Sequence, residues 1–238
     1  MPDLAPTIDG MFFALAQSSF ANARDATSAP GGVNTTSTRY GSAVRYIRSA
    51  GRGGGTIHGI TRALFEFDTS GISATPSAAT LKLFGFLGSS ADLFVVKGDT
   101  ATDGALAASD YEPLGWVSGA DNSSNVTKYS SEETSWLSNG YNQITLTAAA
   151  LADMRDDNVI KLMLIENVHD LKNNDPGSNV NASTGMYFQD YTGTSRDPIL
   201  SYTAASAGYG NSVMGVASGN IGSINGVATA NIEKVNGV

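Results

Sequence analysis

The chain has 238 residues and a mass of 24.6 kDa; 41% of the residues are hydrophobic and only 15% are charged. This composition supports one folded domain with a hydrophobic core, and it excludes a charge-rich coiled coil and a disordered chain of high net charge. The chain has no cysteine and only two histidines, which excludes disulfides, thiol nucleophiles and a three-histidine zinc site.

The charge is unevenly distributed along the chain. The net charge of −8 argues against a nucleic-acid-binding protein, which normally carries a basic surface. Residues 1–62 hold six Arg and three Asp, whereas residues 63–238 hold 8 basic and 19 acidic residues. The arginine-bearing first quarter of the chain either meets an acidic protein surface or presents solvated guanidinium groups.

Residues 1–22 are expected to form an N-terminal arm or a short helix, with Asp9 as the N-cap of a helix over residues 10–20. The apolar run Met11–Ala16 is short, and no Lys or Arg precedes it, so the segment does not have the pattern of a signal peptide. No stretch reaches the 18 apolar residues of a membrane-spanning helix. We therefore expect a protein that is used where it is made, without membrane insertion.

Residues 23–204 are expected to form the folded domain, because short apolar or alternating segments recur there between turn-like sequences. The sequence predicts strands over Thr61–Asp68, Ala79–Phe86, Asp92–Lys97, Asn142–Thr147, Val159–Glu166, Gly185–Asp190 and Ile199–Thr203. Asp92–Lys97 follows a Gly-Ser-Ser turn, which predicts a hairpin with the preceding strand, and Val159–Glu166 is apolar enough to be a central buried strand.

One helix is predicted over Ala148–Asp156, with Thr147 as its N-cap, and Gly/Ser/Asn-rich loops are expected at residues 29–43, 118–127 and 172–184. Many short strands with few helices favour an all-β fold. The predicted fold is an antiparallel β-sandwich of jelly-roll type with one short helix, an N-terminal arm and an extended repeat tail.

Three segments of this domain resemble jelly-roll modules of the DNRLRE type, which are related to one group of carbohydrate-binding modules. They are TRALFEFDTSGI at Thr61–Ile72, ATLKLFGF at Ala79–Phe86, and MYFQDYTGTSRDPILSYTA at Met186–Ala204. The family's Ser-Arg-Glu turn is replaced here by Phe188-Gln189-Asp190. The resemblance implies a jelly roll, and it implies sugar binding only weakly because a fold does not fix a function.

The tail, residues 205–238, contains an 11-residue repeat: VMGVASGNIGS, INGVATANIEK and then VNGV. Asn-Gly pairs at 225–226 and 236–237 favour tight turns, so each unit is expected to form an extended segment and a turn. A unit alone cannot bury its Val and Ile side chains, which predicts strand addition or docking in an assembly. The alternative is a disordered low-complexity tail. The expected assembly residues are Val213, Gly215, Val216, Ile221, Ile224, Gly226, Val227, Ile232, Val235 and Gly237.

The tail resembles the "INGV…ANIxKVNGV" endings of structural proteins of marine, cyanophage-like bacteriophages. The resemblance implies a virion component that is assembled in the host bacterial cytoplasm: a tail-fibre or tail-tip part, or a capsid decoration or head-fibre protein. It also implies a homo-oligomer, a trimer in the case of a fibre, that contacts other virion proteins.

Catalytic signatures are weak in this sequence. The adjacent pairs Glu132-Glu133 and Asp156-Asp157 are expected to be solvated, because neighbouring side chains diverge in a strand or a helix. A catalytic triad would have to use His58 or His169, and the chain has no G-x-S-x-G motif. We therefore expect no enzyme, with a β-sandwich hydrolase or lyase as the lowest alternative.

Calcium is the ion that the sequence would suit best. The loop at 169–177 offers Asp170, Asn173 and Asp175 as oxygen ligands, but its spacing is not that of an EF-hand, and a plain Asx-rich turn is the favoured interpretation. A similar, weaker cluster is Asp99, Asp103 and Asp110.

For sugar binding, the candidates are exposed aromatic side chains, because pyranose rings pack on aromatic faces. Tyr111 and Trp116 flank Pro113 and form the preferred pair, and Trp136 is the third candidate; aromatic core residues are the alternative reading. The leading hypothesis is thus a phage structural protein, and the alternative is a carbohydrate-binding module that attaches to a cell-surface glycan.

Overall fold

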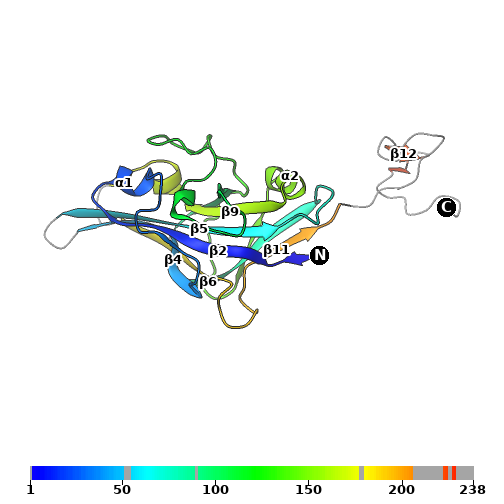
Figure 1. The fold of residues 1–238 in the computed structure, drawn as a ribbon, viewed down its shortest axis with the longest axis horizontal. Helices are drawn as coiled ribbons and strands as arrows, with labels where there is room; N and C mark the ends of the chain where they lie inside the picture. Colours follow the sequence, from blue (N-terminus) through cyan, green and yellow to red (C-terminus); the bar gives the residue numbers. More distant parts are fainter. Residues whose placement is uncertain are drawn as a thin grey trace.

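The computed structural model describes residues 2–50, 55–88, 91–176, 180–205, 222–224 and 227–228, and it is mostly antiparallel β-sheet (Figure 1). Its elements are β1 (Asp3–Leu4), β2 (Pro6–Gln17), α1 (Phe20–Arg24), β3 (Val33–Asn34), β4 (Arg39–Ala50), β5 (Thr56–Asp68), β6 (Ala78–Gly88), β7 (Leu93–Lys97), the 3₁₀ turn η1 (Ala108–Tyr111), β8 (Tyr141–Thr145), α2 (Ala148–Asp156), β9 (Val159–Glu166), the π-helical turn η2 (Asn167–Leu171), β10 (Val180–Tyr187), β11 (Ile199–Thr203), β12 (Ser223–Ile224) and β13 (Val227–Ala228).

β5 organises the sheet. It pairs with β2 along one edge, and along the other edge it pairs first with β4 and then with β9. β9 continues to β7, while β4 continues through β10 to β6. β6 also pairs with β11 and β8, and β1 pairs with the far edge of β11. The sheet therefore folds over on itself, with β4 and β10 joining the layer that contains β5 and β9 to the layer that contains β6 and β11.

The main core fills the space between these two layers. Phe65 and Phe67 of β5 and Leu164 of β9 meet Leu81 and Leu83 of β6 in one cluster of fully buried side chains. The rings of Phe65 and Phe188 stack at a centroid distance of 5.7 Å. Because these residues recur at every second position, each strand presents one apolar face to the other layer. The expected all-β sandwich is confirmed.

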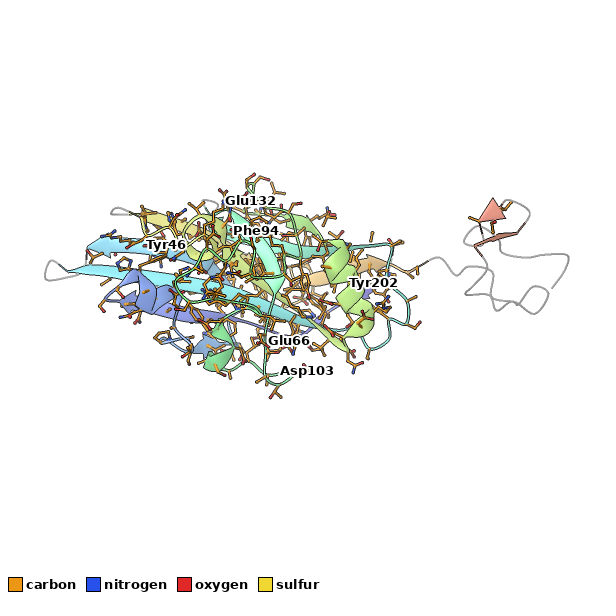
Figure 2. The ribbon with its side chains drawn as sticks, turned by 90° about the horizontal axis from the view of Figure 1, so that it is seen from above. Tyr46, Glu66, Phe94, Asp103, Glu132 and Tyr202 are labelled. Atoms are coloured by element: carbon orange, nitrogen blue, oxygen red, sulfur yellow. The ribbon has the colours of Figure 1, made fainter. Side chains whose placement is uncertain are left out.

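A second core covers the opposite face of the β5 layer. Leu64 of β5 and Met163 of β9 lie in it together with Phe20 of α1 and Leu171 of η2. Figure 2 shows how the side chains pack against the strands. Because β5 and β9 are covered on both faces, both alternating sets of their side chains are buried. This explains the nearly continuous apolar sequence of β9, which lies between β5 and β7 as the central strand that the sequence predicts.

The predicted strands and helix are largely confirmed. β9, β11 and α2 have the predicted bounds, and β5, β6, β7, β8 and β10 overlap their predicted segments. Thr147 precedes α2 with an extended backbone, but its side chain donates to the carbonyl of Lys128 instead of capping the helix. The predicted hairpin before β7 is wrong: β7 pairs with β9, because both of its faces are apolar and suit the layer that is covered on both sides.

The helix expected over residues 10–20 is also wrong. Residues 6–17 form β2, where Met11 faces the main core and Phe12 faces the second core. Such opposite burial of neighbours requires the two-residue period of a strand. Asp9 caps no helix; its side chain is 4% exposed and accepts a hydrogen bond from the backbone N–H of Gln189 at 2.8 Å.

The described part of the tail is a short antiparallel pair. Ser223–Ile224 pairs with Val227–Ala228, on either side of residues 225–226. This agrees with the predicted alternation of extended segment and turn in the repeat. The pair forms a two-stranded sheet of its own, and the Val227 side chain is 49% exposed.

Candidate functional site

A buried arginine cluster occupies the loop region where the sequence predicts ligand-binding residues. Arg62 of β5 donates from Nε and Nη2 to the two carboxylate oxygens of Asp170 at 2.8 and 2.7 Å, and both side chains are fully buried. Asp170 lies in η2, and the Glu166 side chain accepts hydrogen bonds from the backbone N–H groups of Val168, His169 and Asp170. Burial lowers the pKa of Arg62, but the charge and hydrogen bonds of Asp170, together with Tyr111 and Glu112, raise the pKa above its ordinary value.

Tyr111 and Trp116 belong to this cluster rather than to an exposed platform. The Arg62 guanidinium lies 4.1 Å from the centroid of the Tyr111 ring and 4.4 Å from that of Trp116, and Arg24 lies 4.4 Å from Trp116. Tyr111 is fully buried and its hydroxyl donates to the carbonyl of Ala23. The interpretation of these two rings as a glycan-binding pair is therefore wrong, because their faces stack on guanidinium groups.

The predicted calcium ligands are not brought together. Both oxygens of Asp170 are engaged by Arg62, and the Asn173 amide donates to the carbonyl of Gly119 at 2.7 Å. Asp175 lies 3.5 Å from Arg48. Within the described ranges, no group of three or more His, Asp or Glu side chains is placed to hold a metal ion. The similar cluster around Asp99 also separates, because Asp110 is buried and accepts hydrogen bonds from the backbone N–H groups of Ala101 and Ala107.

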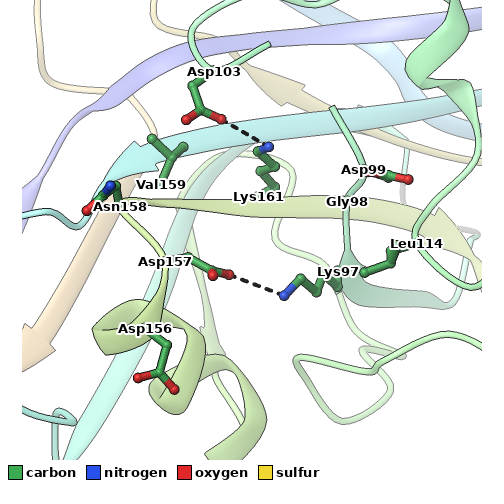
Figure 3. A pocket seen from close by; sticks show the side chains of 10 residues that line it. All are labelled: Lys97, Gly98, Asp99, Asp103, Leu114, Asp156, Asp157, Asn158, Val159 and Lys161. Carbon is green, nitrogen blue, oxygen red and sulfur yellow. Dashed lines mark hydrogen bonds and ion pairs between the residues drawn. The ribbon is translucent and has the colours of Figure 1, made fainter. Parts of the chain in front are cut away.

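A polar hollow of about 420 Å³ lies where the end of β7 and the start of β9 meet the end of α2 (Figure 3). Its walls carry two lysines and four aspartates: Lys97, Lys161, Asp99, Asp103, Asp156 and Asp157. The loop that bears Asp103 is held by Glu66, whose buried carboxylate accepts from the Thr100 hydroxyl at 2.5 Å and from the Gly104 N–H at 2.7 Å. Glu66 and Asp103 are labelled in Figure 2. The sequence did not predict this hollow.

The two lysines of the polar hollow are held in ion pairs. Lys97 lies 3.0 Å from Asp153 and 3.2 Å from Asp157, and Lys161 lies 3.0 Å from Asp103. Burial lowers the pKa of Lys97, but its hydrogen bonds to the two aspartates outweigh burial and raise it. Protonated lysines do not act as nucleophiles. The hollow has a net negative lining, which suits a cationic group.

A smaller groove of about 290 Å³ runs beside β8, lined by Glu133, Ser135, Trp136, Leu137, Tyr141, Asn142 and Gln143. The indole N–H of Trp136 donates to the carbonyl of Gly185 at 3.0 Å. The segment passes so close to β6 that a Cβ at Gly85 would collide with the carbonyl oxygen of Leu137, so this position requires glycine. Of the three predicted glycan-binding aromatics, Trp136 lines this groove, whereas Tyr111 and Trp116 line neither this groove nor the polar hollow.

An arginine face, which the sequence did not predict, lies over β6 and β10. It consists of Arg39, Phe84, Phe86, Tyr187, Tyr191 and Arg196. The Arg39 guanidinium lies 4.5 Å from the Phe86 centroid, and that of Arg196 lies 4.8 Å from the Tyr187 centroid. Arg196 also donates to the Tyr187 hydroxyl at 2.6 Å. Aromatic side chains alternating along β6 were the available signal, but the loop that supplies Arg196 could not be placed from its sequence.

Most of the predicted assembly residues in the tail lie outside the described residues: Val213, Gly215, Val216, Ile221, Gly226, Ile232, Val235 and Gly237. Ile224 and Val227 are described, and they pair across the two-stranded sheet. Their proposed role in assembly stays a prediction.

No family model matches the chain, and no curated protein matches its sequence. Among the described residues, no helix has the length and apolar character needed to cross a bilayer.

Proposed function

We propose that this chain is a non-enzymatic structural protein of a phage particle. In this proposal, the particle displays the β-sandwich and the repeat tail joins it to neighbouring subunits. The observation that carries the proposal is the 11-residue repeat, together with the isolated pair β12–β13. A two-stranded sheet is at best marginally stable in water, and Val227 is 49% exposed in it. Such a segment becomes more stable when a further strand or a partner surface covers its apolar side chains.

The role in the particle is either that of a tail-fibre or tail-tip part or that of a capsid decoration or head-fibre protein. A fibre requires the repeats of three chains to wind together, whereas a decoration protein requires them to lie on shell subunits. The proposal rests on the repeat and its resemblance to phage structural proteins. It places the protein in the virion, after assembly in the host cytoplasm, as a homo-oligomer in contact with other virion proteins.

The test is light scattering coupled to gel filtration, on the full chain and on a chain that ends at Ala204. We expect the full chain to be oligomeric and the shortened chain to be a folded monomer. A matched full-length variant replaces Val213, Val216, Ile224, Val227 and Val235 with Ser, which removes apolar contacts but keeps the length. It should behave as the shortened chain does. Equal masses for all three proteins would contradict the proposal.

A second candidate function is glycan binding in the groove beside β8. The specific observation is that Trp136 and Tyr141 line the same groove as Glu133 and Gln143, so that aromatic and hydrogen-bonding groups converge there. Trp136 contacts the main core, so its removal would also affect folding. Gln143→Ala and Tyr141→Ala are therefore the variants to compare on a glycan array. The absence of any retained glycan on the unchanged protein would rule this function out.

A further inference from the structure

The arginine face has cationic groups that lack acidic partners. Within the described part of the chain, neither Arg39 nor Arg196 has a carboxylate within 4.0 Å, although four other arginines are paired with aspartates: Arg24, Arg48, Arg62 and Arg155. The Arg39 residue is exposed and Arg196 is half-buried. In both arginines Nη1 donates to a tyrosine hydroxyl, whereas Nε and Nη2 have no hydrogen-bond partner among the described residues. The geometry of these two N–H groups matches the two oxygens of a carboxylate.

The loop that supplies Arg196 also carries Asp190 and Asp197, but these do not neutralise it. Both carboxylates are close enough to the buried Asp9 to raise its pKa. One oxygen of Asp197, Oδ1, is buried. The loop thus has its acidic groups near β2 while Arg196 stacks on the aromatic rings of β6 and β10.

The polar hollow offers the complementary charge. The Asp103 side chain is 57% exposed and that of Asp156 is 53% exposed, even though each has an ion-pair partner. Asp99 is also exposed, and no cation lies within 4.0 Å of it in the ranges that the structure describes. In Figure 1, α2, which borders the hollow, lies on one side of the sheets, and the loop between β10 and β11 projects from the other side.

We propose that the arginine face of one copy of this chain docks on the polar hollow of a second copy. The proposal rests on the proposed function, because a particle brings many copies together. The two surfaces differ and lie on opposite sides of the molecule, so the contact is heterologous and repeats from copy to copy, as a ring or a row. Tyrosine, phenylalanine and arginine are enriched in protein interfaces, which agrees with the composition of the face.

A second copy fits this face better than a polysaccharide does. Sugar rings pack on open aromatic faces, but here the guanidinium groups of Arg39 and Arg196 lie over the rings of Phe86, Phe84 and Tyr187. The Nε and Nη2 groups of these arginines have no partner among the described residues, and two such N–H groups bind a carboxylate well. The chain has an excess of them, with 22 acidic against 14 basic residues.

The test uses full-length chains carrying Arg196→Glu or Asp99→Lys, with Lys172→Glu as a control that makes the same charge change as Arg196→Glu on an exposed residue elsewhere. Sedimentation velocity at low and high salt measures association. We expect each of the first two variants to weaken the growth of assemblies by about tenfold or more, and the control to leave it unchanged. For the unchanged chain, high salt should have the same effect as either variant, since salt screens exposed charges.

Mixing the variants gives the sharper result. A chain with Arg196→Glu keeps its hollow and a chain with Asp99→Lys keeps its arginine face, so the mixture should regain one contact per pair of chains. A single chain with both changes should regain association through the swapped pair. Thermal unfolding of each variant shows that it is folded; Arg196→Gln and Arg39→Gln replace the glutamate variant if that one does not fold.

The outcomes separate this contact from the tail. If the charge variants and the control associate equally, while loss of the tail abolishes the oligomer, the docking proposal is wrong and the proposed function stands. If the chain ending at Ala204 associates as strongly as the full chain does and this association is salt-sensitive, the tail proposal fails and the docking contact stands. If Arg196→Glu leaves association unchanged but removes binding to polygalacturonate, the face binds a polysaccharide and the docking proposal is overturned.

Discussion

The molecule holds two clusters in which guanidinium groups stack on aromatic rings, one buried and one at the surface. In the buried cluster, Arg62 lies on Tyr111 and Trp116 and both oxygens of Asp170 fill its N–H edge. In the arginine face, Arg196 lies on Tyr187 in the same manner, but hydroxyl groups are its hydrogen-bond partners. The two clusters share the stacking of a guanidinium on aromatic rings, but only the buried cluster has a carboxylate partner for it among the described residues.

This difference separates a structural cluster from one that is available for binding. A buried guanidinium must be paired, because an isolated charge in a core is very costly. Arg62 joins β5 to η2 and to the carbonyl of Tyr111, and it thereby holds the second core over the sheet. Arg196 is only half-buried and has no carboxylate within 4.0 Å among the described residues, so its Nε and Nη2 groups stay available to an incoming carboxylate.

The largest effect is expected on breaking the buried pair. Asp170→Asn leaves Arg62 with an uncompensated buried charge, so the free energy of unfolding should fall by about 3–5 kcal/mol. Urea denaturation at neutral pH measures this loss. The control is Asp175→Asn, which removes an exposed partner of Arg48 and should change the stability by less than about 1 kcal/mol. Equal effects at the two positions would show that the buried pair does not hold the second core.

Asp9 can be compared with Asp170, because it is a buried carboxylate that has no arginine partner among the described residues. Burial is the main cause that raises its pKa from 3.8 to about 7, and the nearby Asp190 and Asp197 add to it. The folded state therefore binds this proton more tightly than the unfolded state does. The stability that the proton confers is fully present below about pH 4 and is lost as the pH rises towards about 7.

Asp9→Asn should accordingly stabilise the protein at pH 8 by up to about 4 kcal/mol and have little effect at pH 4. Unfolding curves of both proteins across this range measure the difference. The sign is opposite to that of Asp170→Asn at neutral pH. A destabilising effect of Asp9→Asn at pH 8 would show that the carboxylate makes favourable contacts as an anion.

The smallest effect is expected at the arginine face. Arg196→Ala removes hydrogen bonds to the hydroxyls of Tyr187 and Tyr191 at a half-buried position, so the stability should change by less than about 1 kcal/mol. Thermal unfolding at low protein concentration, where chains do not associate, gives this value. A loss as large as that of Asp170→Asn would make the face a structural cluster and end the distinction between the two.

The sequence predicts the strands that carry strong apolar patterns and misses those that do not. β9 and β11 have the predicted bounds, because burial of their apolar side chains is enough to determine where these strands begin and end. β4 begins at Arg39 inside a stretch rich in Gly, Ser and Arg, and its strand character comes from pairing with β5 and β10. β2 contains Ala and Leu residues that favour a helix locally, but contacts with β5 outweigh this preference.

The candidate surfaces were less accessible to sequence reasoning. The prediction that Tyr111 and Trp116 form an exposed pair is wrong, because the guanidinium of Arg62 covers both rings. Arg62 lies 49 residues from Tyr111 in the sequence, so no local pattern indicates this contact. Asp170 looks like a metal ligand in its Asx-rich loop, but η2 turns it towards Arg62. Such pairings depend on the three-dimensional arrangement of β5, η1 and η2, and no local pattern encodes them.

We propose that chains assemble through the repeat tail, and hydrogen–deuterium exchange on the full chain is the measurement that tests this role. Exchange is measured at a low concentration, where light scattering shows monomers, and at a high concentration, where it shows oligomers. We expect amides of residues 205–238 to gain protection at the high concentration, while those of β5 and β9 are protected equally at both concentrations. Unchanged, rapid exchange throughout 205–238 in the oligomer would contradict it.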